Sequence, residues 1–168
     1  GAAAVAKASG YPDILAFDVG GTSTDVSLVL GGRPLFTSER TVAGYPIKSP
    51  AVDVNAIGAG GGSIAWIDGG GALKVGPQSA GAEPGPACYG NGGVLPTVTD
   101  ANVVLGRINP DYFLGGNMQL DEGAAITSIT GLAKVLKTTV ESAAMGILQI
   151  ANNNMVGAMR LVLAEKGL

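Results

Sequence analysis

The chain lacks residue types that many catalytic and structural sites require. It has no histidine and a single cysteine among its 168 residues. Without histidine, the chain by itself cannot supply a Ser-His or Cys-His nucleophile pair or a histidine ligand for a metal. One cysteine cannot form a disulfide framework, so the composition favours a reducing, cytoplasmic setting.

Charged residues are also scarce, at 14% of the sequence, and the net charge is −3. A chain without a basic run has no electrostatic footprint for nucleic acid. Hydrophobic residues make up 46%, but the most apolar stretch, AAMGILQIA (143–151), is too short to cross a membrane. We therefore expect neither nucleic acid nor a membrane as a partner, and one globular domain over residues 1–168.

Strand patterns fill the first part of the chain. Three strands are predicted, at residues 14–18, 25–30 and 34–42. The GG pair at 31–32 is typical of a two-residue hairpin turn, so these strands should form a three-stranded antiparallel meander. Residues 43–63 are predicted to be irregular, and residues 63–75 to form a second hairpin.

The remainder carries helix signals. Helices are predicted to begin near Thr97, Asp121 and Thr138, and Glu141 has capping-box spacing from Thr138. The pattern predicts an α/β fold class. Along the chain the strands come first and the helices afterwards, as in α+β proteins. The chain does not begin with Met, and residues 1–9 resemble the last turns of a helix, so we expect an internal piece of a longer protein.

The stretch DVGGTSTD (18–25) joins two predicted strands with a polar turn. Gly20 and Gly21 can place consecutive N–H groups on one side of the turn and let a ligand approach the backbone, which suits an anion. Hydroxyl donors suited to phosphate oxygens follow at Thr22, Ser23 and Thr24. The stretch is neither a Walker A loop nor a Rossmann fingerprint.

Asp18 would repel phosphate unless a cation lay between them. Mg²⁺ keeps most of its hydration shell and binds one or two carboxylates together with phosphate, so Asp18 is a candidate Mg²⁺ ligand. Asp25 could serve similarly, or could fix the turn by accepting backbone N–H groups. The alternative is a polar hairpin turn in which both acids are local caps.

The segment GAGGGS (58–63) could form a second anion-binding turn through Gly60, Gly61, Gly62 and Ser63, or it could be a flexible turn. Residues 76–96 follow, and ten of these 21 residues are Gly or Pro. Their length and their prolines favour a functional loop of fixed shape over free coil.

The Gly/Pro loop contains Cys88, the one potent nucleophile of the chain. A lone cysteine is usually just buried, and no histidine is present to activate this one, so the catalytic residues stay unknown. Lys74 and Arg107 flank the loop. Each is either a solvated charge or an anion contact.

Several of these segments resemble one known family: FDVGGTSTDVSLV, GAGGGSIAWID, LKVGPQSAGAEPGPACYGNGG, PTVTDANVVLGRINPDYFLGG and NNNMVGAMR. They look like the hydantoinase A / 5-oxoprolinase family. That family includes N-methylhydantoinase, 5-oxoprolinase and the ATP-hydrolysing subunits of acetone and acetophenone carboxylases. The resemblance covers essentially the whole chain. The Gly/Pro block is specific to the family, whereas actin, sugar kinases and Hsp70-like ATPases share the DxGGTxTD turn.

The resemblance implies an actin-like (ASKHA) ATPase core made of two RNase H-like halves, with ATP bound between them. Residues 18–25 resemble the phosphate-binding hairpin of the second half, and the chain would be that half, incomplete at both ends. Its partners would be the first half of the same chain and a second subunit of hydantoinase B type. Gly20, Gly21, Thr22, Ser23 and Thr24 would contact phosphate, and Asp18 would position Mg²⁺ or the attacked phosphate.

By the same resemblance, we expect the whole protein to be an ATP-dependent enzyme that opens a small cyclic amide of the hydantoin or 5-oxoproline type. We expect the 168-residue segment alone to be inactive. Phosphoryl transfer needs positioning and charge neutralisation more than covalent work by the protein, which suits a chain of turns, hydroxyls and acids. The alternatives are the ATPase subunit of a ketone carboxylase, and a structural module with a vestigial nucleotide site.

Overall fold

The computed structural model describes residues 1–42 and 44–168. The chain forms two compact units. Unit 1 comprises Gly1–Asp18, Thr24–Ile57 and Val156–Leu168, and unit 2 comprises Val19–Ser23 and Gly58–Met155. That residues 1–168 form a single domain, which is one half of a larger ATPase core, stays a prediction. No helix among the described residues is long and apolar enough to cross a membrane.

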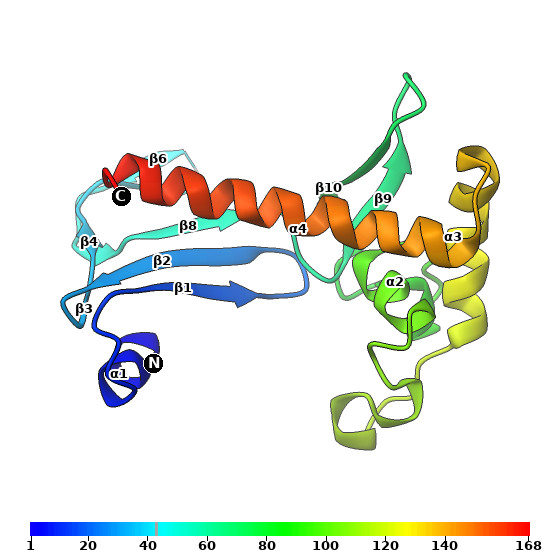
Figure 1. The fold of residues 1–168 in the computed structure, drawn as a ribbon, viewed down its shortest axis with the longest axis horizontal. Coiled ribbons are helices and arrows are strands. Elements are labelled where there is room, and N and C mark those ends of the chain that lie inside the picture. The colour runs from blue at the N-terminus through cyan, green and yellow to red at the C-terminus, as the bar shows by residue number, and fades with distance from the viewer. Residues whose placement is uncertain (43) are drawn as a thin grey trace. The chain divides into compact units, whose positions relative to one another are not determined.

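Unit 1 is built on a sheet in which β2 (Thr24–Leu30) is central. On one side it pairs with β1 (Ile14–Val19), and on the other with β3 (Arg33–Pro34) and β8 (Val54–Ile57). Figure 1 shows β1, β2 and β8 side by side. The predicted turn at 31–32 is confirmed: both glycines have positive φ, and Val29 and Leu30 pair with Pro34 and Arg33.

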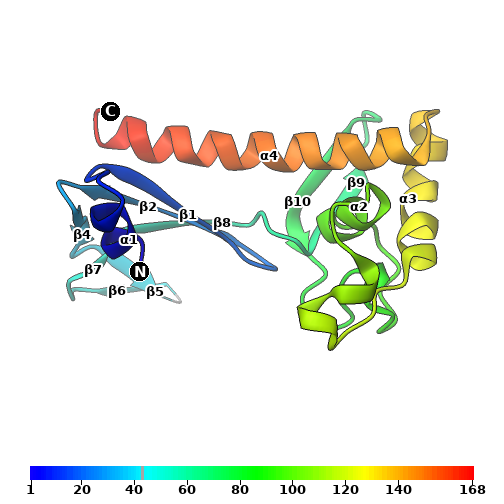
Figure 2. The same cartoon turned by 60° about the horizontal axis from the view of Figure 1, so that its bottom comes forward.

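The prediction of one continuous third strand over 34–42 is wrong. Beyond β3, that stretch forms β4 (Phe36–Thr37) and β5 (Arg40–Val42). The region predicted to be irregular supplies their partners, β7 (Ala51–Val52) and β6 (Tyr45–Ile47), and also β8; residue 43 lies outside the described residues. The chain therefore leaves the sheet early, and β8 pairs with β2 from Thr24↔Ile57 to Ser27↔Val54. Figure 2 shows these short strands.

A small apolar cluster forms the core of unit 1. Val26 and Leu28 of β2 are buried and pack with Val162 near the end of α4 (Val140–Glu165). α1 (Ala2–Ala8) buries Ala6, and Gly10 follows it at positive φ, close to the predicted helix end.

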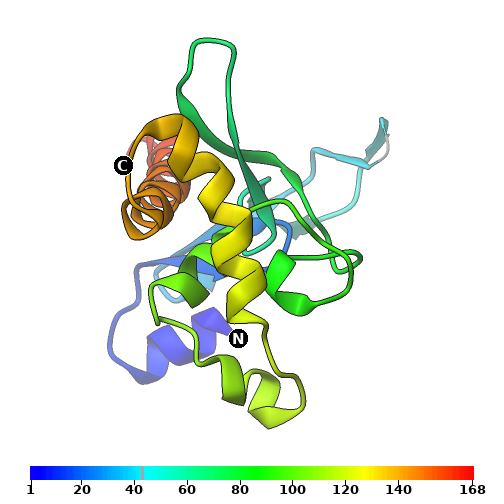
Figure 3. The same ribbon diagram turned by 90° about the vertical axis from the view of Figure 1, so that its right-hand side faces the viewer.

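Unit 2 contains the second predicted hairpin, formed by β9 (Ser63–Ile67) and β10 (Leu73–Ser79). Its helices are α2 (Val98–Val104), α3 (Glu122–Leu136) and the first part of α4 (Figure 3). The hairpin and helices enclose a core that includes Ala65, Val75, Ala101, Ile129, Ala144, Ile147 and Leu148. Three 3-10 turns lie in the connecting loops, at Ala87–Tyr89, Pro110–Tyr112 and Leu114–Gly116.

Two of the three predicted helix caps are confirmed. Thr97 and Asp100 form a reciprocal capping box at α2, and Asp121 accepts the N–H of Ala124 at α3. The third cap is one residue later than predicted, because the Thr139 hydroxyl, not that of Thr138, accepts the N–H of Ser142. Thr138 and Thr139 are adjacent, so either could cap the helix, and the sequence spacing does not distinguish the two positions.

Candidate phosphate-binding site

The turn at residues 20–23, which lies in unit 2, keeps its shape through its own backbone. The N–H of Gly20 donates to the carbonyl of Ser23 at 2.8 Å. Within the part of the chain that the structure describes, the N–H groups of Gly21, Thr22 and Ser23 donate to no acceptor. Gly21 and Thr22 are exposed and Ser23 is half-buried. Three adjacent donors beside two hydroxyls are chemically suited to an anion such as phosphate.

The segment at residues 60–63 packs directly against this turn. The N–H of Gly61 donates to the carbonyl of Gly20 at 3.0 Å, and that of Gly62 donates to the carbonyl of Gly21 at 2.6 Å. A Cβ on Gly60 would lie 2.6 Å from the Gly20 oxygen and 2.9 Å from the Ser23 nitrogen. Glycine is needed at position 60 because two backbones meet there without room for a side chain.

The predicted donors of the 60–63 segment are engaged inside the chain. Besides the two bonds to the turn, the N–H of Gly60 donates to Ser63 Oγ at 2.9 Å, and the N–H of Ser63 donates to the Gly60 carbonyl at 3.1 Å. Ser63 is fully buried. Direct binding of cofactor by these four residues stays a prediction, while the observed geometry gives them a supporting role behind the 20–23 turn.

Two further residues hold the supporting segment from behind. The N–H and the hydroxyl of Thr99 both donate to the Gly61 carbonyl, at 2.8 and 2.9 Å. The N–H of Ala80, at the start of the Gly/Pro loop, donates to the Gly62 carbonyl at 2.8 Å. No sequence signal points to Thr99, because only Thr97, two residues earlier, has the spacing of a helix cap.

Asp18 and Asp25 lie on neighbouring strands of unit 1. Both are exposed and line one surface hollow together with Ser27 and Val54. Within the described residues neither carboxylate forms a hydrogen bond or ion pair, so neither acts as the local cap of the alternative interpretation. No group of three or more metal-binding side chains occurs among those residues. Two carboxylates fit a cation that keeps most of its water, as Mg²⁺ does.

Thr24 differs from the other predicted phosphate contacts. It is fully buried at the start of β2, whereas the exposed Thr22 and half-buried Ser23 present their side chains nearer the surface. The structure therefore brings together residues 20–23 with 60–63, and separately Asp18 with Asp25.

A buried carboxylate organises part of the Gly/Pro loop, while the fixed shape of the whole loop stays a prediction. Asp100 accepts the N–H groups of Cys88 at 2.8 Å and Ala87 at 3.3 Å, and also the N–H and hydroxyl of Thr97. Asp100 is fully buried, so these four donors replace the water that its carboxylate loses. This interaction was not visible in the sequence beyond the helix cap itself.

Cys88 has the properties of a structural residue. Its side chain is fully buried, and this burial, with the charge of Asp100, raises the pKa of the thiol far above its ordinary value. A thiol that stays protonated and inaccessible cannot act as a nucleophile. Lys74 lies 3.7 Å from Asp68, and the Arg107 guanidinium donates to the Met145 sulfur at 3.8 Å, so both flanking cations face other side chains.

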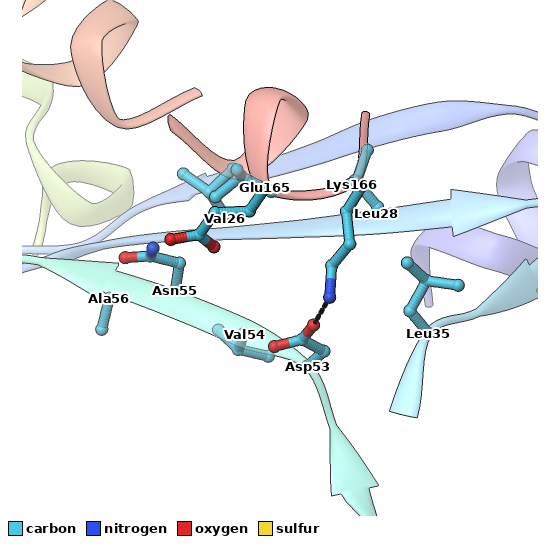
Figure 4. Close-up of a pocket in the computed structure, with 10 residues that line it drawn as sticks. Val26, Leu28, Leu35, Asp53, Val54, Asn55, Ala56, Glu165 and Lys166 are labelled. Atoms are coloured by element: carbon cyan, nitrogen blue, oxygen red, sulfur yellow. Dashed lines mark ion pairs between the residues drawn. The ribbon is translucent and has the colours of Figure 1, made fainter. Parts of the chain in front are cut away.

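A second hollow in unit 1 is unsuited to phosphate. It is lined by Val26, Leu28 and residues of β8, and the Lys166 ammonium points into it toward Asp53 (Figure 4). The two charged groups pair at 2.6 Å, and Glu165 adds a further carboxylate. The ion pair neutralises Lys166, which is the one cation among the described residues that line the hollow.

Comparison with known proteins places these features in one family. The hydantoinase/oxoprolinase family model matches residues 1–168. The chain is 47% identical to caprolactamase subunit alpha of Pseudomonas jessenii, over 97% of this chain and 24% of the relative. It is 42% identical to the acetophenone carboxylase gamma subunit of Aromatoleum aromaticum, over 99% of this chain and 23% of the relative.

A solved structure of acetone carboxylase, titled as ATP-dependent and nucleotide-free, superposes with a TM-score of 0.88 at 33% identity. The match covers 99% of this chain and 24% of that one. The match confirms the fold class predicted from the sequence. The chain spans about a quarter of the length of each of these three proteins. Because the family model covers every residue, the chain belongs to the hydantoinase/oxoprolinase family.

Proposed function

We propose that this chain supplies a phosphate-binding turn to an ATP-dependent enzyme that opens cyclic amides. The observation that carries the proposal is the 20–23 turn, where three consecutive N–H groups lack an acceptor within the described residues. The close packing of the 60–63 segment behind it supports the same role, because it fixes the direction of the donors. Pre-positioned donors stabilise phosphate charge without reorganising during the reaction.

In this proposal, each part of the chain has a separate task. The N–H groups of Gly21, Thr22 and Ser23 bind phosphate oxygens, and the two nearby hydroxyls add donors. Asp18 and Asp25 hold hydrated Mg²⁺ by their carboxylates. ATP, when bound, supplies the phosphoryl group that activates an otherwise unreactive amide oxygen. Phosphoryl transfer requires mainly positioning and charge stabilisation from the protein, which is the role proposed for this chain.

A ketone carboxylase subunit is the second candidate. It is favoured by the structural match to acetone carboxylase and by the identity to the acetophenone carboxylase gamma subunit. Both candidates need the same phosphate turn, so the turn cannot separate them. The relatives named as subunits alpha and gamma support a second subunit as a partner of the whole protein. The hydantoinase B type of that subunit is part of the proposal.

Substrate-dependent ATP turnover by the whole protein, purified with its co-expressed partner, separates the candidates. The substrates are hydantoin, 5-oxoproline and caprolactam, each compared with acetone plus bicarbonate. We expect stimulation by at least one cyclic amide and none by the ketone. If only acetone plus bicarbonate stimulated ATP turnover, the chain would instead belong to a ketone carboxylase subunit.

The Asp18→Ala variant tests the remaining alternative, a structural module with a vestigial site. We expect ATP turnover to fall because the cation loses one of two carboxylates. The matched control is Asp111→Ala, which removes an exposed acid in unit 2 and should leave turnover unchanged. Wild-type turnover in Asp18→Ala would favour the vestigial site.

A further inference from the structure

We propose that Thr99 is a positioning residue for the 20–23 turn, acting through Gly61; this rests on the proposed function. The hydroxyl and the N–H of Thr99 both donate to a single carbonyl, that of Gly61. Two donors on one acceptor fix the direction of that carbonyl more tightly than either donor alone. Thr99 itself is only 7% exposed, so water competes little for these bonds.

The contacts continue from Gly61 into the turn. The N–H of Gly61 donates to the Gly20 carbonyl at 3.0 Å, and the N–H of Gly20 donates to the Ser23 carbonyl at 2.8 Å. Gly61 therefore links Thr99 to the turn: its carbonyl accepts from Thr99, and its N–H donates to Gly20. A rotation at Gly61 would displace the turn whose free N–H groups are proposed to bind phosphate.

The position of Thr99 is itself well determined. It lies between the two residues of the capping box, Thr97 and Asp100, both of which are fully buried and hydrogen-bonded to each other. A Cβ on Gly61 would lie 2.9 Å from Thr99 Oγ1, so the hydroxyl occupies the space that a side chain at position 61 would need. The fit of hydroxyl and glycine indicates a specific contact rather than a chance approach.

The experiment compares Thr99→Val, which removes the hydroxyl, with Thr99→Ser, which keeps it. The matched control is Thr130→Val in α3, where the lost hydroxyl likewise donates to a backbone carbonyl, that of Ile126 at 2.7 Å. Each variant is made in the whole protein. The kcat, the KM for ATP, the KM for the activating substrate and the melting temperature are measured for each.

We expect Thr99→Val to lower kcat/KM for ATP by about tenfold or more, since misplacement by a fraction of an ångström weakens phosphate positioning. The KM for the activating substrate should not change, and Thr99→Ser and Thr130→Val should match the wild type. Wild-type kinetics in Thr99→Val would overturn the proposal. Equal damage in Thr99→Ser, or loss of the native fold in Thr99→Val, would also overturn it, since Thr99 would then be a purely structural residue.

Gly21→Ala, measured in parallel, keeps this proposal separate from the proposed function. If Gly21→Ala weakens ATP turnover while Thr99→Val does not, only the positioning role fails. If the wild type shows no ATP turnover, or Gly21→Ala equals the wild type, the phosphate-binding function itself fails.

Discussion

Replacing Gly60 by alanine should destabilise the protein by forcing two backbones apart. The added Cβ would lie 2.6 Å from the Gly20 oxygen, 2.9 Å from the Gly21 carbonyl carbon and 2.9 Å from the Ser23 nitrogen. All three are backbone atoms, so no flexible side chain can move aside. Residues 20–21 are also held by the N–H groups of Gly61 and Gly62, which would have to shift with them.

The size of the destabilisation depends on how the structure responds to the added methyl group, and two responses are possible. Strain from overpacking costs about 1–3 kcal/mol. Moving the turn instead would break the two bonds from Gly61 and Gly62, at about 0.5–1.5 kcal/mol each. Either response gives a loss of roughly 1–3 kcal/mol in the free energy of unfolding. Urea unfolding of the wild type and the Gly60→Ala variant measures this difference.

Gly21→Ala is the matched control for that measurement. A Cβ on Gly21 meets no atom within 4 Å, and Gly21 does not have the left-handed φ that strains other residues. Its stability should equal that of the wild type or exceed it by up to about 1 kcal/mol, because alanine restricts the unfolded chain. If Gly60→Ala were as stable as the wild type, the close packing of Gly60 against the backbone of residues 20–23 would be refuted.

Three further outcomes are expected. Asp100→Ala should lower the free energy of unfolding by about 3 kcal/mol or more in urea titration, because it leaves at least three buried N–H groups without their acceptor, each costing about 1–3 kcal/mol. Cys88 should react with a thiol reagent at pH 8 only after denaturation, because burial and Asp100 raise its thiol pKa; rapid labelling of the native protein would contradict this. Asp68→Ala should destabilise the β9–β10 hairpin more than Asp68→Asn, whose amide oxygen can still accept the N–H groups of Gly70 and Ala72. The pKa of Asp68 is lowered chiefly by the hydrogen bond from Ala72, so the wild-type advantage over Asp68→Asn should be fully present above the ordinary carboxyl pKa and be lost as pH falls through the lowered pKa of the folded protein.

Local signals in the sequence predicted much of the fold. The turn at Gly31 and Gly32 and the caps at Thr97 and Asp121 each depend on residues a few positions apart. The strand β8 could not be predicted in this way. Its four residues carry a weak pattern, and it is a strand because it pairs with β2, about 30 residues away in the sequence.

The candidate site was predictable only in part. Glycines and hydroxyls at residues 20–23 indicated an anion site, and the free N–H groups of that turn agree with this. The role of the 60–63 segment was not readable, because the need for Gly60 comes from the backbone of Gly20, 40 positions earlier. Thr99 and Asp100 were hidden for the same reason: their acceptors and donors lie in other loops.

The most direct test of the central claim is calorimetric titration of the whole protein with ATP and Mg²⁺, for the wild type and for Gly21→Ala. We expect Gly21→Ala to keep its melting temperature and to bind ATP at least about tenfold more weakly, because the methyl group occupies the space beside the free N–H groups. An unchanged dissociation constant in a stable Gly21→Ala protein would contradict the assignment of the 20–23 turn to phosphate.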